Sequence, residues 1–249
     1  IFFLYCMGCC LFKPPAVEIN LGPCQKKPCT AFNTNRSTFF IDDNKSLWKY
    51  CEEKNQIEAD YLYTNNMAIM NLPPNPYVLK PLSVSRTVNT IITSMSLASI
   101  DLFEFIRRPF NWDFMCKELK HIADGIHYLH HHGLAHRDIK PENIVLREGR
   151  LCLIDWDFCY PIDERMECGT VNFKCPRTVS CNWNCSSTSF SKKTDVYAFG
   201  KLIFAIFWQA SFHKMVDCKE FIFNAFHCDS MEKTEIPFKG TWAVWANIA

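Results

Sequence analysis

A run of eight residues near the middle of this 249-residue chain limits what it can fold into more than any other feature, and its sequence over residues 136–143 is His-Arg-Asp-Ile-Lys-Pro-Glu-Asn. The run places a carboxylate at Asp138, an ammonium at Lys140 and an amide at Asn143. Phosphoryl transfer depends mainly on positioning and charge neutralisation, and these groups supply both. Asp138 can accept the proton of an attacking hydroxyl, Lys140 can hold a γ-phosphate, and Asn143 can ligate a metal ion.

The whole run matches the catalytic-loop signature H-R-D-x-x-x-x-N, and the chain therefore resembles the eukaryotic-type protein kinases. The resemblance implies transfer of the γ-phosphate of ATP to a protein substrate, with Mg²⁺ as the metal. It makes Asp138 and Lys140 the catalytic residues and Asn143 a ligand of the metal within the nucleotide site. The sequence Lys-Pro-Glu over residues 140–142 favours Ser/Thr over Tyr as the acceptor.

The residues Asp155, Trp156 and Asp157 follow a short apolar run and stand where the family carries its D-F-G motif. Asp155 is then the second ligand of the metal, beside Asn143, because Mg²⁺ needs few protein carboxylates. Trp156 keeps an aromatic side chain in the place of Phe. Asp157 replaces a flexible Gly, and Asp tolerates the left-handed conformation better than most residues. Asp157 either caps the local backbone or adds a second carboxylate near the metal.

The segment after this motif matches the family less completely. Gly169 and Thr170 resemble its G-T pair, and the resemblance implies contacts from Thr170 to Asp138 and Lys140. Asp195 resembles the residue that holds the catalytic-loop backbone from below. Arg177 stands where the family has Glu, which leaves this part of the match incomplete.

The N-terminal half lacks the glycine-rich loop G-x-G-x-x-G-x-V that covers the phosphates in the family. Gly22 is the one glycine of segment 21–27 and is our candidate for this loop. Lys49 is the best candidate for the phosphate-binding lysine, with Lys45 as the alternative. Glu58 is expected to be the helix-borne partner of Lys49 and completes the predicted nucleotide site.

Hydrophobic periodicity and turn residues predict strands first and helices later. Strands are expected at 37–41, 46–51, 77–82 and 87–95, with a helix at 52–65. Helices are then expected from Leu102 to the break at Pro109, at 114–130 and at 195–208, with short strands at 143–146 and 151–154. The pattern predicts an α+β, two-lobed, protein-kinase-like fold: an apolar tail over 1–15, a small β-rich N-lobe with one helix over 16–97, and a mainly helical, shortened C-lobe over 98–249.

Composition limits the partners and the compartment. Lys+Arg 27 against Asp+Glu 26 gives a net charge of +1, so no strong field favours nucleic acid. The apolar stretches over 1–12 and 195–208 are shorter than the roughly 20 residues that span a bilayer, and no stable membrane span is predicted. The 15 cysteines, an odd number, favour reduced thiols and hence an intracellular protein, cytoplasmic or nuclear, with a protein substrate as its partner.

Two functions remain open. An active kinase needs four chemical groups, and all four are present, at Asp138, Lys140, Asn143 and Asp155. A pseudokinase that keeps the fold and acts as a binding or scaffold module is favoured by the missing glycines and by Asp157.

Overall fold

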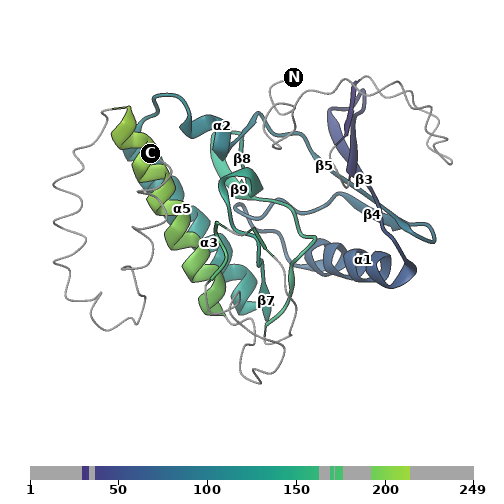
Figure 1. The fold of residues 1–249 in the computed structure, drawn as a ribbon. Helices are drawn as coiled ribbons and strands as arrows, with labels where there is room; N and C mark the ends of the chain where they lie inside the picture. Colours follow the sequence, from purple (N-terminus) through teal and green to yellow (C-terminus); the bar gives the residue numbers. More distant parts are fainter. Residues whose placement is uncertain (1–29, 34–36, 163–168, 171, 176–191, 214–249) are drawn as a thin grey trace.

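A five-stranded antiparallel sheet forms the N-terminal lobe (Figure 1). The computed structural model describes residues 30–33, 37–162, 169–170, 172–175 and 192–213. The strands lie in the order β1-β2-β3-β5-β4, and each neighbouring pair is antiparallel. Their bounds are β1 Thr30–Asn33, β2 Ser37–Ile41, β3 Ser46–Glu52, β4 Ser83–Arg86 and β5 Thr90–Ser96.

The hairpin between β2 and β3 turns where the sequence predicts it. Asp42 Oδ1 accepts a hydrogen bond from the backbone N–H of Ser46 at 2.8 Å, and Lys45 has a φ of 59°. An Asp side chain that satisfies the backbone of its own turn stabilises such a connection. The resulting register pairs Phe39 with Lys49, and this register determines where Lys49 lies on the sheet.

One helix, α1 (Gln56–Asn71), packs against β4 and β5 (Figure 1). It starts later than the expected 52–65 because Asn55 caps it: Asn55 Oδ1 accepts from the backbone N–H of Glu58 at 3.0 Å. It also continues further, and it ends two residues before Pro73, which cannot extend a helix.

The segment over 77–82 joins the two lobes and is not the expected strand. Its Tyr77 carbonyl accepts from Leu153 N at 2.8 Å, and Leu79 N donates to Leu153 O at 3.0 Å. Leu153 ends strand β9 (Arg150–Leu153) of the second lobe. Backbone hydrogen bonds and one isolated bridge, between Val78 and Leu153, therefore attach the segment to the second lobe, and it adds no strand to the five-stranded sheet.

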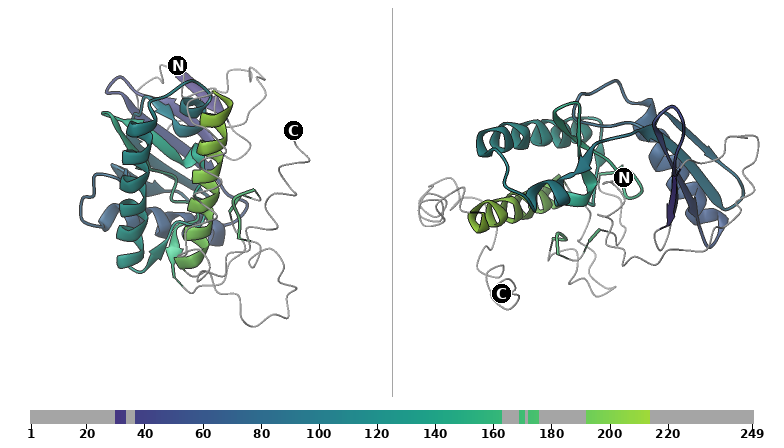
Figure 2. Two further views of the ribbon diagram at one scale, coloured as in Figure 1. Left: turned by 90° about the vertical axis from the view of Figure 1, so that its left-hand side faces the viewer. Right: turned by 90° about the horizontal axis from the view of Figure 1, so that it is seen from above.

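Helices dominate the described part of the second lobe, and two of them, α3 and α5, run side by side (Figure 2). Two small antiparallel sheets carry the catalytic loop between them: β8 pairs with β6 and β9 in one, and β7 pairs with β10 in the other. The bounds are β6 Ile100–Asp101, α2 Leu102–Ile106, α3 Trp112–His131, β7 Leu134–Ala135, the 3₁₀ turn η2 Pro141–Asn143, β8 Ile144–Arg147, β10 Tyr160–Pro161 and α5 Lys192–Phe212.

Helix α3 forms because its apolar residues recur at helical spacing and its ends carry the expected signals. Asn111 caps it by accepting from the backbone N–H of Phe114 at 2.7 Å. Gly133, just past its end, has a φ of 75°, a conformation that costs glycine little. The buried stripe faces the main core, which also receives Ile69 from α1 and Leu202 from α5.

A second, smaller cluster joins the lobes. Phe39 and Leu47 from the sheet pack against residues of the second lobe, and all of these side chains are at most 9% exposed. The second-lobe members are Ala98, Val145, Cys152 and Ile154. Burial of such side chains is worth about 1.5–3 kcal/mol each, so this cluster holds the sheet over the catalytic loop. The two-lobed α+β fold expected from the sequence is confirmed.

Helix α5 is longer than the expected 195–208, since it covers Lys192–Phe212. Within the described ranges, no helix combines the length and the apolar character that crossing a membrane requires.

Candidate active site

The catalytic loop is held from below by a single buried carboxylate. Asp195 of α5 is fully buried, and its Oδ1 accepts from Arg137 N at 2.8 Å. Its Oδ2 accepts from His136 N at 2.8 Å and lies 2.8 Å from His130 Nε2. Arg137 has a φ of 67°, which is unfavourable for a residue with a Cβ and is retained only where neighbouring groups enforce it. Asp195 therefore fixes the backbone that presents Asp138.

Asp138 lies at the centre of a hydrogen-bond network that the sequence motif predicts. Asn143 Nδ2 donates to Asp138 Oδ2 at 2.9 Å and to the Asp138 carbonyl at 2.8 Å. Lys140 Nζ lies 2.9 Å from the same Oδ2. Asp138 Oδ1 accepts from Thr170 Oγ1 at 2.7 Å and from Thr170 N at 2.9 Å, and Lys140 Nζ donates to Thr170 Oγ1 at 2.8 Å. The structure thus brings Asp138, Lys140, Asn143 and Thr170 together.

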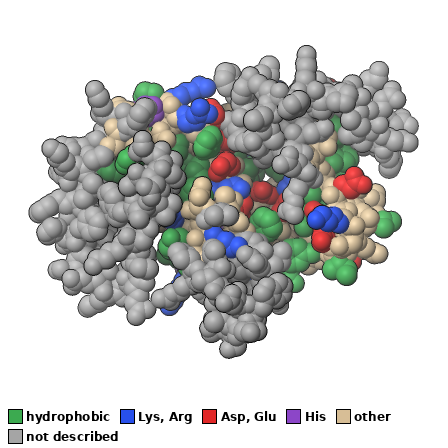
Figure 3. Space-filling model, in the orientation of Figure 1, with side chains coloured by type: hydrophobic (Ala, Val, Ile, Leu, Met, Phe, Trp, Pro, Cys, Tyr) green, Lys and Arg blue, Asp and Glu red, His purple; other side chains and the backbone are tan. Residues whose placement is uncertain are grey.

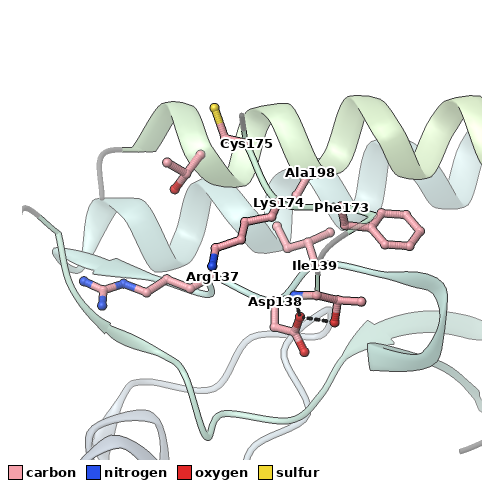
Figure 4. A pocket seen from close by; sticks show the side chains of 9 residues that line it. Arg137, Asp138, Ile139, Phe173, Lys174, Cys175 and Ala198 are labelled. Carbon is pink, nitrogen blue, oxygen red and sulfur yellow. Dashed lines mark hydrogen bonds between the residues drawn. The ribbon is translucent and has the colours of Figure 1, made fainter. Parts of the chain in front are cut away.

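The surroundings of Asp138 leave its carboxylate directed away from α5. Figure 4 shows the Arg137 side chain extending away from Asp138, while Phe173, Lys174 and Cys175 lie between the loop and α5. A small pocket opens there and is lined partly by Ile139. Its lining includes Asp138 and Thr170 of the catalytic network as well as Thr194 and Ala198 of α5.

Asn143 lies just before β8, and Asp155 lies just after β9. Because these two strands pair, Asn143 and Asp155 lie next to each other. Ile154 N donates to the Asn143 carbonyl at 3.0 Å, and His136 Nε2 lies 3.0 Å from the Ile154 carbonyl. Asp155 has a φ of 67°, and its side chain is 27% exposed. One carboxylate and one amide oxygen on adjoining backbone form the kind of donor set that Mg²⁺ accepts, so these residues fit a magnesium ion.

Lys49 reaches this carboxylate from the other lobe. Its Nζ lies 3.0 Å from Asp155 Oδ1 and 2.5 Å from Asp157 Oδ2, and its side chain is only 11% exposed. Burial alone lowers the pKa of Lys49, but the charges of Asp155 and Asp157 outweigh burial, and the pKa is raised well above its usual value. The ammonium therefore stays charged throughout the physiological range.

The pKa values of the two carboxylates shift in opposite directions, although Lys49 lowers both of them. Burial raises the pKa of Asp155, but the charges of Lys49 and Lys140 outweigh it and hold this pKa below its usual value. For Asp157, burial and the neighbouring Asp155 charge together exceed the effect of Lys49 and raise the pKa. Figure 3 shows basic and acidic side chains next to each other in the hollow at the centre of this face.

The expected ion pair between Lys49 and Glu58 is wrong. Glu58 lies in the first turn of α1, where its Oε1 accepts from Asn55 Nδ2 at 3.2 Å. Asp157, which the sequence left as a cap or a metal ligand, takes its place beside Lys49. The physical reason is the late start of α1, which puts Glu58 at the capped end of the helix instead of its middle.

The other nucleotide-site candidates have separate outcomes. Lys45, the alternative to Lys49, is exposed in the β2–β3 turn. Gly22 lies outside the described residues. The sequence between β1 and β2, Thr-Asn-Arg over 34–36, contains no glycine.

Sequence reasoning missed two residues of this region, Asn65 and Asn66 of α1. They are 1% and 4% exposed, and both donate to Asp157: Asn65 Nδ2 to its carbonyl at 2.8 Å and Asn66 Nδ2 to its Oδ1 at 3.4 Å. Two adjacent amides at the centre of a helix are unusual for a buried face and are the one signal that could have indicated them.

Comparison with known proteins agrees with this geometry. A sequence model described as "Protein kinase domain" matches residues 42–248. The chain is 26% identical to inhibitor of nuclear factor kappa-B kinase subunit alpha of Gallus gallus over 179 residues. This aligned stretch covers 63% of this chain and 22% of that protein. It is 30% identical over 136 residues to serine/threonine-protein kinase PRR2 of Saccharomyces cerevisiae, 51% of this chain and 20% of that protein.

A third relative is the phosphorylase b kinase gamma catalytic chain, liver/testis isoform, of Bos taurus, 22% identical over 148 residues, 52% of this chain and 36% of that protein. The chain therefore spans well under two thirds of the length of these relatives. The family match covers most of the chain, and the chain belongs to the protein kinase domain family.

Proposed function

We propose that this protein is an ATP-dependent protein kinase that transfers the γ-phosphate to Ser or Thr hydroxyls. The observation that carries the proposal is the hydroxyl of Thr170, which donates to Asp138 Oδ1 at 2.7 Å while Lys140 Nζ lies 2.8 Å from the same hydroxyl oxygen. A carboxylate and an ammonium already arranged around one alcohol can arrange themselves around a substrate alcohol in the same way.

In the proposed reaction the substrate hydroxyl donates to Asp138 and attacks the γ-phosphorus. Its proton passes to Asp138 as the new oxygen–phosphorus bond forms and the bond to the β-phosphate oxygen breaks, which releases ADP. Lys140 Nζ, 2.9 Å from Asp138 Oδ2, neutralises charge on the moving phosphoryl group. Asn143 and Asp155 would hold Mg²⁺, which when bound neutralises phosphate charge.

Lys49 is the proposed contact to the phosphates of the nucleotide. Its raised pKa keeps it cationic, and its position beside Asp155 puts the positive charge next to the proposed metal site. Serine and threonine are proposed as acceptors because of Thr170 and because relatives such as the yeast protein are named serine/threonine-protein kinases.

We further propose an intracellular location, cytoplasmic or nuclear. In the described ranges, five cysteines (Cys51, Cys116, Cys152, Cys159 and Cys175) are free thiols. Free thiols on this scale are typical of reducing compartments.

A binding module is the second candidate, and two observations favour it. Phe39 and Leu47 from the sheet are buried against Val145 and Ile154 of the second lobe, so apolar side chains occupy the junction between the lobes. The connection over 34–36 also lacks the glycines that let a backbone approach phosphates closely. A pseudokinase needs neither an open junction nor glycines.

Transfer of labelled phosphate from ATP to a generic basic protein separates the two candidates. The full chain with Mg²⁺ is compared with Asp138→Asn and with Asp113→Asn, which changes an exposed carboxylate of α3. The proposal predicts a loss of about 10²–10⁴-fold in Asp138→Asn and none in Asp113→Asn. Phosphoamino-acid analysis of the product identifies the acceptor. No transfer by the wild type, together with no thermal shift on addition of Mg·ATP, supports the binding module.

A further inference from the structure

The acidic residues of α1 are both engaged away from Lys49. The helix carries two carboxylates, at Glu58 and Asp60. Glu58 pairs with the capping Asn55, and Asp60 forms an ion pair with Arg86 of β4. The helix therefore offers Lys49 no charge of its own, although Lys49 is 11% exposed and an ammonium buried to this extent needs a partner.

The part of α1 that faces Lys49 is neutral and reaches it through Asp157. Asn65 and Asn66 are buried, and their amides donate to the carbonyl and to Oδ1 of Asp157. The other carboxylate oxygen of Asp157, Oδ2, lies 2.5 Å from Lys49 Nζ. Asp157 thus contacts α1 on one side and Lys49 of strand β3 on the other.

Asp155 cannot serve Lys49 alone once it ligates a metal. In the proposed kinase Asp155 would hold Mg²⁺, and less of its charge would then remain for the Lys49 ammonium. Asp157 remains, because its second oxygen and its carbonyl are already held by the two amides of α1. Among the described residues, a glycine at this position would leave Lys49 only Asp155 as a paired carboxylate, which it would share with the metal.

We propose that Asp157 is a positioning residue that holds Lys49 in the nucleotide site and does so in place of a helix-borne acid. This inference rests on the proposed kinase function, because the position of Lys49 matters to catalysis only if Lys49 contacts ATP. It also assigns a purpose to the two buried amides, which orient Asp157 where a helix carboxylate would otherwise reach the lysine directly.

The test uses the full chain and measures KM for ATP and kcat separately in three variants. Asp157→Asn removes the charge and keeps the shape, and Asp157→Gly removes the side chain. The third variant combines Asp157→Gly with Asn66→Glu, which returns a carboxylate to the same location from the helix. Asp60→Asn is the matched control, because it removes an ion-paired carboxylate of α1 that lies outside the site.

We expect the two single variants at 157 to raise KM for ATP at least about tenfold with a smaller change in kcat, because the lost interaction acts on nucleotide binding. We expect the double variant to recover most of that loss and the control to match the wild type. An unchanged or lower KM in Asp157→Asn overturns the inference, as does a double variant no better than Asp157→Gly. If Asp157→Gly does not fold, Asp157→Asn alone decides.

Failure of the kinase hypothesis is distinguishable from failure of this inference. A wild-type protein that neither binds Mg·ATP in calorimetry nor transfers phosphate overturns the proposed function and the inference with it. If the wild-type protein binds Mg·ATP and transfers phosphate, and the variants at 157 have the same KM and kcat as the wild type, the inference alone is overturned.

Discussion

The two halves of the candidate active site are assembled in different ways. In the catalytic half, Asp138, Lys140 and Asn143 lie within six consecutive positions, and Lys140 Nζ and Asn143 Nδ2 each lie 2.9 Å from Asp138 Oδ2. In the nucleotide half, Lys49 meets Asp155 and Asp157 across 106 and 108 positions of sequence. A site made from one loop keeps its geometry with the loop, whereas a site made from distant segments can exchange one partner for another.

The two halves also differ in the residues that hold them in place. A fully buried carboxylate, Asp195, accepts three hydrogen bonds beneath the catalytic loop. The carboxylates of the nucleotide half are 27% and 21% exposed and are held by neutral amides and one ammonium. The support of the catalytic half is therefore concentrated in one buried residue, and that of the nucleotide half is divided among several groups.

The largest expected effect comes from removing the support of the catalytic half. Asp195→Asn should lower the free energy of unfolding by about 3–5 kcal/mol, because it removes a buried charge and replaces one acceptor oxygen by an NH2 group, which cannot accept from His130 and His136. The corresponding cut in the nucleotide half, Lys49→Met, should lower it less, because water can solvate the partly exposed carboxylates. Urea denaturation of both variants checks this order, and an equal loss would remove the distinction between the halves.

A smaller effect is expected where the segment of Gly169 and Thr170 meets the catalytic loop. Gly169 has a φ of 93°, and a Cβ there would lie 2.6 Å from the Arg137 carbonyl oxygen. Gly169→Ala should cost more than about 2 kcal/mol of stability and displace Thr170 from Asp138, which lowers kcat. Gly149→Ala is the control, since Gly149 has a φ of 77° and open space around its Cβ, so only stability should fall. Equal kcat in the two variants would contradict the close approach.

Removal of one hydroxyl tests the network around Asp138. Thr170→Val keeps the shape and deletes the group that bonds Asp138 and Lys140, so kcat should fall by roughly 10–100-fold, the equivalent of about 1.5–3 kcal/mol for hydrogen bonds to charged groups. Thr170→Ser keeps the hydroxyl and should retain most of the activity. Steady-state kinetics measures kcat of both variants. Equal kcat in Thr170→Val and Thr170→Ser would contradict this role of the hydroxyl.

The smallest effect concerns the electrostatic surroundings of the nucleotide half. Burial and the charge of Asp157 raise the pKa of Cys51 to about 12. The folded protein therefore holds this proton more tightly than the unfolded chain between about pH 9 and pH 12, and stability must decline as the pH rises through that window. Cys51→Ala should make the decline shallower by about 1 kcal/mol between pH 9 and pH 10.

Thermal unfolding of the wild type and of Cys51→Ala at about pH 9 and pH 10 measures this difference in stability. Cys116, whose side chain is exposed, provides the comparison, and Cys116→Ala should change the slope less. A slope that is unchanged in Cys51→Ala would show that the thiol is not in the environment described.

The catalytic half could be predicted from sequence because its chemistry is local. The spacing of Asp138, Lys140 and Asn143 implies their meeting once the loop forms. The partner of Lys49 could not be predicted in this way, since Asp157 reaches it only after β9 has been placed under the sheet. Helical spacing alone made Glu58 a reasonable partner, and the Asn55 cap, which determines where α1 begins, overrode it.

The strand expected over 77–82 failed for a related reason. Its residues have the apolar character of a strand, but the sequence contains no signal for which lobe it joins. It pairs with Leu153 of the second lobe, and Trp156 Nε1 donates to the Leu79 carbonyl at 3.1 Å. Both contacts are long-range, and propensity does not report long-range pairing.

Calorimetric titration of Mg·ATP into the full chain tests the central claim, that the two halves form one nucleotide-using site with separate tasks. We expect saturable binding by the wild type, binding retained in Asp138→Asn, and affinity reduced at least about tenfold in Lys49→Met. The absence of binding by the wild type, or equal binding by the wild type and Lys49→Met, would contradict it.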